Sequence, residues 1–335
     1  MKERRHHEAG APSRRSGRGA ILRRRAGSGF TYRDADGGRV TDPEALARIE
    51  ALAIPPAWRN VRIAGSAREH VQATGVDAAG RKQYLYAQRW RDRQDARKFD
   101  RALELAERLP AIRRAVTADL RGRSGAREQA LAAALRLVDR AGFRVGSRRY
   151  ARRHGSFGVT TLQRRHVTLD GDLVAFDFPG KSGMRWCLEL KDTDLAAYLA
   201  ARPRGGARSR ALGFEDEAGF HPLSASAVNV YLRQKAGISA SAKDLRTWRG
   251  TVVAAEALVR EGARGSDADS AWRAAVADAA EWLHNTSAVA RGSYVDPRLL
   301  LAFHEGRNLT TRGGTMSDSC LADVLRSTPR SGPGT

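Results

Sequence analysis

Residues 156–190 have the sequence SFGVTTLQRRHVTLDGDLVAFDFPGKSGMRWCLEL, and this stretch decides the fold class. β-Branched and aromatic residues gather in three short runs, and turns containing glycine separate them. The turn around Lys181 places this lysine at an exposed tip, where it could reach a ligand. The pattern predicts strands over Phe157–Leu162, Leu173–Phe178 and Met184–Leu190, joined by turns at Asp170–Asp172 and Gly180–Gly183.

The pattern beyond residue 100 is otherwise mostly helical. Alanine, leucine and arginine recur there with a period close to that of an α-helix. The periodic segments cover residues 100–118, 125–141, 224–236, 246–261 and 271–284. A short sheet inside a mainly helical region indicates an α+β domain.

The N-terminal part has a different pattern. Thr41-Asp42-Pro43-Glu44 is a helix-start signal, because Asp can cap a helix and Pro is tolerated in its first turn; this helix should run to Leu52. Short β-type runs follow at 61–63, 70–74 and 81–86, and an Asp-Ala-Ala-Gly turn separates the last two. These runs predict a small antiparallel sheet.

Composition divides the chain into four segments. Residues 1–28 contain nine Lys and Arg, two acidic residues and no aromatic residue, which predicts a disordered basic tail. Residues 29–93 should form the small N-terminal domain and residues 94–307 the larger domain. Residues 308–335 are rich in Thr, Ser, Gly and Pro, so we expect a weakly ordered tail with one helical turn around Leu321–Leu325.

The charge balance points to a polyanionic partner. The chain of 335 residues has 59 Lys and Arg against 37 Asp and Glu, a formal charge of +22. A net charge of +15 remains outside the basic tail, so the folded body is basic as well. This charge argues against a small anionic metabolite as the sole partner and favours nucleic acid. Only seven of the cations are lysines, so the position of each arginine is more informative than their abundance.

Cysteine usage and hydropathy predict the cellular compartment. Cys187 and Cys320 lie far apart without metal-ligand spacing, which argues against a disulfide scaffold and fits a reducing cytosol. No apolar run approaches the roughly 20 residues that span a bilayer. We therefore expect a cytoplasmic, nucleoid-associated protein without membrane contact.

Metal and nucleotide chemistry have no signature here. The chain has no His-Glu-x-x-His motif, no Cys/His quartet and no Asp-rich calcium loop. Ala175–Ser182 ends in Gly-Lys-Ser, but Ala175 occupies the position where a phosphate loop requires glycine. The remaining cations could act on a phosphodiester without metal, because Arg side chains can stabilise charge on its nonbridging oxygens. Taken alone, Lys181 can also be interpreted as an ordinary turn lysine, and Tyr294 as an aromatic residue that caps the core.

Several ordered motifs resemble type IB DNA topoisomerases, specifically the compact poxvirus-like form found in bacteria. In the N-terminal part, Ile54–Trp58, Gln72–Asp77 and Gly80–Tyr86 are similar to the family's DNA-clamping domain. The resemblance implies that Gln83, Tyr84 and Tyr86 touch DNA, and it extends this role to Arg81, Tyr150 and Lys243. Gln and Tyr side chains suit base edges and phosphates. Aromatic packing across the sheet is the alternative for one of the tyrosines.

In the larger domain the resemblance covers four motifs, and it implies the tyrosine recombinase/topoisomerase IB catalytic fold. Arg144 and Arg246 match the two catalytic arginines, Lys181 the general acid of the hairpin, and Tyr294 the nucleophile. These motifs are Phe143–Gly146 with Gly158–Leu162, Pro179–Gly183, Lys243–Trp248 and Ala290–Pro297.

Two positions depart from the viral enzymes. Asn285 stands where they have a histidine, as bacterial members typically do; an amide donates a hydrogen bond but supplies no positive charge. Its neighbour His284 is interpreted as structural, because adjacent residues on a helix diverge by about 100°. Ser147 stands where the viral form has a lysine, so the viral target sequence is not expected.

The resemblance implies a monomer that encircles duplex DNA and relaxes supercoils of both signs. Tyr294 would form a 3′-phosphotyrosyl intermediate, and the strand would be rejoined without ATP, metal or another cofactor. Two alternatives remain open at this point. A tyrosine site-specific recombinase shares the Arg, Lys, Arg, Tyr chemistry, and a non-enzymatic nucleoid protein would use only the charge.

Overall fold

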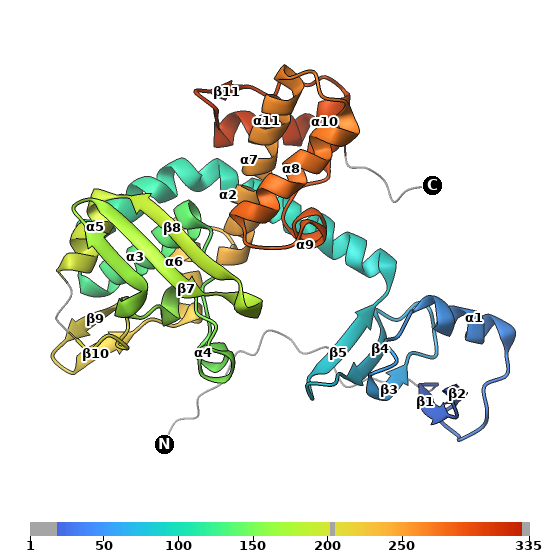
Figure 1. The fold of residues 1–335 in the computed structure, drawn as a ribbon. Helices are drawn as coiled ribbons and strands as arrows, with labels where there is room; N and C mark the ends of the chain where they lie inside the picture. The colour runs from blue at the N-terminus through green and yellow to red at the C-terminus, as the bar shows by residue number, and fades with distance from the viewer. Residues whose placement is uncertain (1–18, 202–204, 330–335) are drawn as a thin grey trace. The chain divides into compact units, whose positions relative to one another are not determined.

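The computed structural model describes residues 19–201 and 205–329, which form two compact units (Figure 1). The division falls between Asp95 and Ala96, inside the 33-residue helix α2 (Gln88–Leu120). Residues 89–98, where charged side chains are frequent, are thus part of a helix. No helix among the described residues is long and apolar enough to cross a membrane.

The first unit is a five-stranded antiparallel sheet with one helix, which confirms the small sheet predicted from the sequence. Asp42 caps α1 (Pro43–Ala51) by accepting a hydrogen bond from the backbone N–H of Ala45. A small core of Ile21, Ile49, Val61, Ile63 and Ala73 lies beneath the sheet. The strand order is β2 (Gly29–Arg33), β1 (Ile21–Ala26), β3 (Arg59–Ile63), β4 (Val71–Val76) and β5 (Lys82–Tyr86).

Strand β1 corrects the predicted extent of the basic tail. Residues 1–18 of that tail lie outside the described residues, but Ile21–Ala26 pairs with β2 and β3. Arg23 donates hydrogen bonds to the backbone oxygens of Ile54, Pro55 and Trp58, at 3.1, 3.1 and 2.8 Å. An Arg-rich segment forms a strand here because neighbouring backbone carbonyls satisfy its buried guanidinium.

The second unit is mostly helical, and it confirms the five predicted helices. One continuous apolar core joins its helices to the inner face of a short sheet. The predicted helices correspond to α2, α3 (Ala126–Ala141), α6 (Ala225–Ala236), α7 (Ala242–Ala263) and α8 (Ala268–Trp282). Shorter elements are α4 (Arg148–His154), α5 (Thr193–Ala200), α9 (Ser287–Ser293), α10 (Arg298–His304) and the hairpin of β9 (Gly213–Asp216) and β10 (Gly219–Pro222).

The short sheet has three antiparallel strands, β6 (Val167–Asp170), β7 (Leu173–Pro179) and β8 (Arg185–Lys191), in that order. The α+β class is therefore confirmed. Two of the predicted strands are β7 and β8, but the prediction of a strand at Phe157–Leu162 is wrong. That segment contains a single 3₁₀ turn, Val159–Thr161. Its backbone donates one hydrogen bond to β7, from Phe157 to the Pro179 oxygen, and the N–H groups of Val159 and Thr160 donate to the loop after α3.

The C-terminal region is more ordered than its composition predicted. A short hairpin of two strands, β11 (Thr311–Arg312) and β12 (Thr315–Met316), leads into helix α11 (Asp318–Ser327). Leu321, Ala322 and Leu325 are buried in the main core, around the position of the single predicted turn. The prediction of a weakly ordered tail is therefore wrong for these residues, because three apolar side chains on one helix face suffice to dock it.

Candidate active site

Arg144 lies in the loop after α3, and backbone hydrogen bonds from the segment Phe157–Leu162 hold it there. The backbone N–H groups of Val159 and Thr160 donate to the carbonyl oxygens of Arg144 and Val145, at 2.9 and 2.8 Å. A Cβ on Gly158 would lie 2.5 Å from the Arg144 oxygen, so only glycine permits this approach. The Phe-Arg-Val-Gly and Gly-Val-Thr-Thr-Leu motifs therefore form one structure that fixes the arginine.

Arg246 projects from the first turns of α7. Ser241 and Asp244 form a capping box at the start of this helix, and Asn229 accepts a hydrogen bond from the backbone N–H of Ala242 at 2.9 Å. The Arg246 side chain is 3% exposed. Burial, and then the charge of Arg144, lower the pKa of Arg246 to about 10. The guanidinium is thus a cation held at a cost in desolvation.

Two nitrogens of Arg246 have no hydrogen-bond partner among the described residues. One terminal nitrogen donates to the Leu283 carbonyl oxygen at 3.2 Å. Within residues 19–201 and 205–329, its Nε and second terminal nitrogen are buried without a hydrogen-bond partner, as is Nδ2 of Asn285. Buried polar groups in native proteins are nearly always paired. These donors are therefore candidates to bind an acceptor that enters the site.

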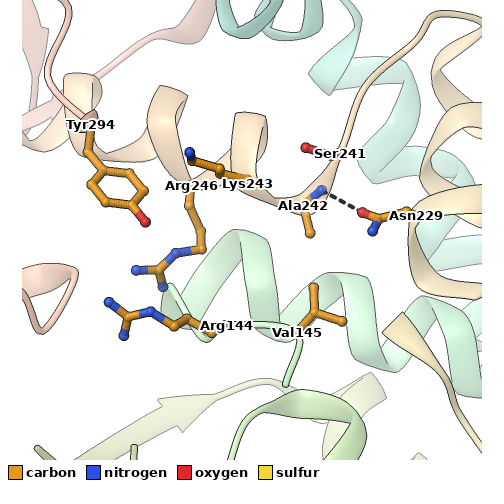
Figure 2. Close-up of a pocket in the computed structure, with 8 residues that line it drawn as sticks. All are labelled: Arg144, Val145, Asn229, Ser241, Ala242, Lys243, Arg246 and Tyr294. Carbon is orange, nitrogen blue, oxygen red and sulfur yellow. Dashed lines mark hydrogen bonds between the residues drawn. The ribbon is translucent and has the colours of Figure 1, made fainter. Parts of the chain in front are cut away.

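Tyr294 follows α9, and its ring lies beside Arg246 (Figure 2). The Arg246 guanidinium carbon is 5.4 Å from the centroid of the ring. Tyr294 as a whole is 9% exposed. Burial alone would raise the pKa of the phenol, but the charges of Arg246 and Arg144 bring that pKa below its ordinary value. The two cations thus favour the phenolate form of Tyr294.

These three side chains line one cavity of about 290 Å³ (Figure 2). Lys243, at the start of α7, lines it too, with an exposed side chain. Asn229 and Ser241 also line the cavity, although sequence reasoning gave neither a role. Helix-capping residues carry no functional signature in the sequence, so only the structure reveals them there.

Asn285 reaches the site through Arg144. Its Oδ1 accepts a hydrogen bond of 2.5 Å from a terminal nitrogen of Arg144. His284 lies just beyond the end of α8 in the left-handed region, with φ 48°, and its ring stacks on Trp186 with centroids 3.7 Å apart. The interpretation that His284 is structural stays consistent with this packing.

Lys181 is exposed at the tip of the hairpin between β7 and β8, as predicted. Its neighbour Ser182 has φ 61° and Gly183 has φ 76°, which makes the turn tight. In the described part of the chain no hydrogen bond or ion pair joins Lys181 to Arg144, Arg246, Asn285 or Tyr294, and it does not line their cavity. The structure brings four of the five residues together and leaves the lysine at the surface.

The predicted DNA-contacting residues of the first unit lie on and around β5. Arg81 and Gln83 both donate to Asp77, at 2.8 and 2.7 Å. Tyr84 is 38% exposed and stacks on Tyr86, with ring centroids 6.2 Å apart. These side chains form an edge that combines a charged pair with accessible aromatic rings.

Sequence reasoning missed the continuation of this aromatic row. Trp90, at the start of α2, stacks on Tyr86 with centroids 4.3 Å apart and planes tilted by 17°. The signal was present, because Tyr84, Tyr86 and Trp90 all lie within seven residues. A strand followed directly by a helix was needed to align them.

Tyr150 lies on α4, and at 57% exposed it is the most accessible large apolar side chain of the described residues. The helix also carries four arginines and no acidic residue. Burial, and then the charges of Arg148 and Arg152, lower the pKa of nearby Arg210. The helix that comes soon after Arg144 in the chain, α4, therefore presents a strongly cationic surface.

Comparison with known proteins identifies the family. Residues 87–296 match the catalytic core of eukaryotic DNA topoisomerase I, and residues 29–77 match the N-terminal domain of bacterial DNA topoisomerase IB. The first match covers more than half of the chain and contains all of the predicted catalytic residues. The chain therefore belongs to the type IB DNA topoisomerase family, enzymes whose partner is DNA.

One relative supports this assignment over most of the chain. DNA topoisomerase 1B of Acanthamoeba polyphaga mimivirus is 26% identical over 295 residues, which cover 82% of this chain and 84% of the viral protein.

Proposed function

We propose that this topoisomerase relaxes positive and negative supercoils by cutting one DNA strand at a time, with Tyr294 as the nucleophile. The phenolic oxygen forms a bond to a backbone phosphorus, and the bond from phosphorus to the 5′-oxygen breaks. The products are a 3′-phosphotyrosyl enzyme and a free 5′-hydroxyl end. Because the new ester preserves the phosphodiester bond energy, the reverse reaction rejoins the strand without ATP. The proposal assigns no step to a metal ion or another cofactor.

The observation that carries this proposal is the buried Tyr294 phenol beside two guanidinium groups. In the proposed reaction Arg144 and Arg246 bind the nonbridging oxygens, where charge accumulates as phosphorus is attacked. The unpaired donors of Arg246 and Asn285 would gain their partners there. A pKa of Tyr294 below its ordinary value eases loss of the phenolic proton during attack.

Lys181 is proposed as the general acid. An alkoxide is a poor leaving group, so the departing 5′-oxygen needs a proton. The lysine lies on an exposed turn, where duplex DNA docked on the second unit could meet it. Arg144 would assist this proton transfer.

DNA binding is proposed to involve both units of one chain. Arg81, Gln83, Tyr84 and Tyr86 would contact DNA from the N-terminal domain, residues 29–93. Tyr150 and Lys243 would contact it from the catalytic domain, residues 94–307. In this proposal the enzyme acts as a monomer, and one chain supplies all five residues assigned to the cleavage reaction. Affinity should fall steeply with salt, because phosphate contacts release counterions.

The family match favours this proposal over a site-specific recombinase, which would use the same four residue types. A purely charge-driven nucleoid protein would not need Arg246 and Tyr294 buried together.

The test is relaxation of supercoiled plasmid in EDTA without ATP, comparing wild type with Tyr294→Phe and trapping adducts with SDS. We expect a ladder of topoisomers and protein linked to the 3′ end of the cut strand with wild type only. Tight DNA binding without relaxation or adduct would refute the proposal, and so would full activity of Tyr294→Phe.

A further inference from the structure

The indole of Trp186 on β8 is the centre of an aromatic cluster behind the active site. The His284 ring lies on one of its faces, with centroids 3.7 Å apart and planes 16° from parallel. The Phe143 ring meets it edge-on, with centroids 4.8 Å apart. Trp186 is 3% exposed, so this packing leaves the indole little freedom.

The aromatic cluster is part of a closed ring of contacts that includes Arg144 and Asn285. Phe143 directly precedes Arg144, and His284 directly precedes Asn285. Arg144 in turn donates to Oδ1 of Asn285 at 2.5 Å. The path from Arg144 through Phe143, Trp186 and His284 to Asn285 therefore returns to its start, so the stacked rings and the hydrogen bond constrain each other.

The lysine-bearing turn packs on the same indole. A Cβ on Gly180 would lie 2.7 Å from Cδ1 and Nε1 of Trp186, so the backbone before Lys181 touches the ring. The Gly180 N–H also donates to the Met184 carbonyl oxygen at 2.7 Å, which closes the turn. One tryptophan thus supports the backbone beside Lys181 and, through His284, the backbone beside Asn285.

His284 adopts a backbone conformation that needs support from its surroundings. Its φ of 48° is uncommon for a residue with a side chain. Burial, and then the charges of Arg144 and Arg246, lower the pKa of its imidazole, with Glu281 and a hydrogen bond to the Arg185 backbone acting in the opposite direction. A neutral ring stacks on the indole without adding a third cation beside the two arginines.

We infer that His284 is a positioning residue of the cleavage reaction, because its ring, stacked on Trp186, fixes the Asn285 amide against Arg144. This inference rests on the proposed function. In this arrangement Oδ1 of Asn285 is occupied by Arg144, so its Nδ2 is the group left to donate to a phosphate oxygen. Without the stack the backbone at Asn285 is less constrained. The Asn285 amide then adopts several orientations, and only some of them bring Nδ2 to the phosphate oxygen.

The test measures single-turnover cleavage of a duplex oligonucleotide and, separately, its binding. The variant is His284→Asn, since Asn tolerates the left-handed region and cannot stack as a ring does. We expect cleavage to slow about tenfold while DNA affinity stays unchanged. His284→Phe, which retains an aromatic ring, should recover most of the rate.

A double-mutant cycle asks whether His284 acts through Asn285. In an Asn285→Ala background, His284→Asn should cause no further loss of cleavage rate. A matched control exists on β10, where His221 stacks on Phe214 with centroids 4.9 Å apart and planes 18° from parallel. His221 does not line the cavity of Arg144, Arg246 and Tyr294. His221→Asn should leave the cleavage rate unchanged.

Three results would overturn the inference: wild-type cleavage by His284→Asn, an equal additional loss in the Asn285→Ala background, or a His284→Phe variant as slow as His284→Asn. Thermal melting of each variant shows that it is folded. An inactive wild type would instead refute the proposed function, so the two failures are distinguishable.

Discussion

Gly250 of α7 lies directly against the backbone of Tyr294. A Cβ at this position would be 3.0 Å from the Tyr294 carbonyl oxygen and 3.2 Å from its Cβ. One turn earlier on the same helix is Arg246, and one residue later Thr251 donates to the same carbonyl oxygen at 3.2 Å. Helix α7 therefore positions both an arginine and the backbone of the tyrosine.

We expect Gly250→Ala to slow cleavage and to lower the melting temperature, because added bulk must push Tyr294 or Leu283 away, at a cost of about 1–3 kcal/mol. Gly262→Ala is the matched control on α7. A Cβ there makes ordinary contacts with Phe303, at 3.5 Å or more, so this substitution should stabilise the helix. Unchanged cleavage by a stabilised Gly250→Ala variant would show that the contact is unimportant.

The pH dependence of cleavage should report the charges around Tyr294. Arg246 and Arg144 lower the pKa of the phenol and outweigh its burial. Removing one positive charge disfavours the phenolate, so Arg246→Gln should move the rise of cleavage rate to higher pH. It should also slow cleavage by about 10²–10³-fold, since a buried donor to the phosphate is lost. Rates are measured in single turnover from pH 6 to 10.

Arg249→Gln provides the comparison for this effect. Arg249 is also on α7, but its guanidinium lies over the Trp282 ring, 5.6 Å from the centroid. Its variant should keep the wild-type pH profile. Equal profiles for Arg246→Gln and wild type would contradict the role assigned to Arg246.

The role of Lys181 can be isolated with a sulfur leaving group. A thiol has a pKa of about 8.5, far below that of an alcohol, so a thiolate departs without a proton. Lys181→Ala should cleave an ordinary duplex very slowly, yet should approach the wild-type rate when sulfur replaces the bridging 5′-oxygen. Lys191→Ala, at the other end of β8, should behave as wild type with both substrates. A defect in Lys181→Ala that sulfur does not correct would exclude the acid role.

Asp318 should contribute strongly to stability. Its carboxylate accepts a hydrogen bond of 2.6 Å from the indole N–H of Trp248 and forms an ion pair with Arg113. We expect Asp318→Ala to lower the free energy of unfolding by about 2 kcal/mol, because the buried indole N–H of Trp248 loses its partner, whereas Arg113 keeps its hydrogen bonds to Asp139. Asp323→Ala, on the exposed side of α11, should change it little. Urea unfolding measures both, and equal effects would contradict the prediction.

Stability should also fall in mild acid because of His166. Burial, and then the charge of Arg165, lower the pKa of its imidazole to about 4. The unfolded chain takes up this proton near pH 6.5, so the unfolded state binds more protons between those two values. The free energy of unfolding should therefore decrease by about 2–3 kcal/mol as the pH falls through this window. His166→Gln should show a shallower decrease in urea unfolding, and an unchanged slope would refute the prediction.

Local patterns were enough to predict most helices and two strands of the catalytic sheet. Periodicity fixes which face of a helix is buried, and the Gly180–Gly183 turn marks its hairpin within the sequence itself. The prediction for Phe157–Leu162 was wrong because the β-branched residues there favour a strand, whereas the close contact of Gly158 with Gly146 decides the structure of this segment. That contact joins residues twelve apart, which a local pattern does not describe.

The site followed a similar division. The resemblance indicated Arg144, Arg246, Asn285 and Tyr294, and the structure brings these residues together. The stack of Trp186 on His284 was not predictable, because it joins residues 98 positions apart with no motif linking them. His284 was assigned on the assumption of a continuing helix, but α8 ends at Trp282 and His284 leaves it with a positive φ.

The contact between Asp318 and Trp248 also has a consequence for protein synthesis. Every residue assigned to cleavage precedes position 295, whereas the carboxylate that binds the Trp248 indole comes 24 residues after Tyr294. A ribosome-bound chain that has just exposed its tyrosine therefore still lacks α11 against α7. Strand-cutting activity should therefore mature only after α11 has left the ribosome and Asp318 has bound the Trp248 indole on α7.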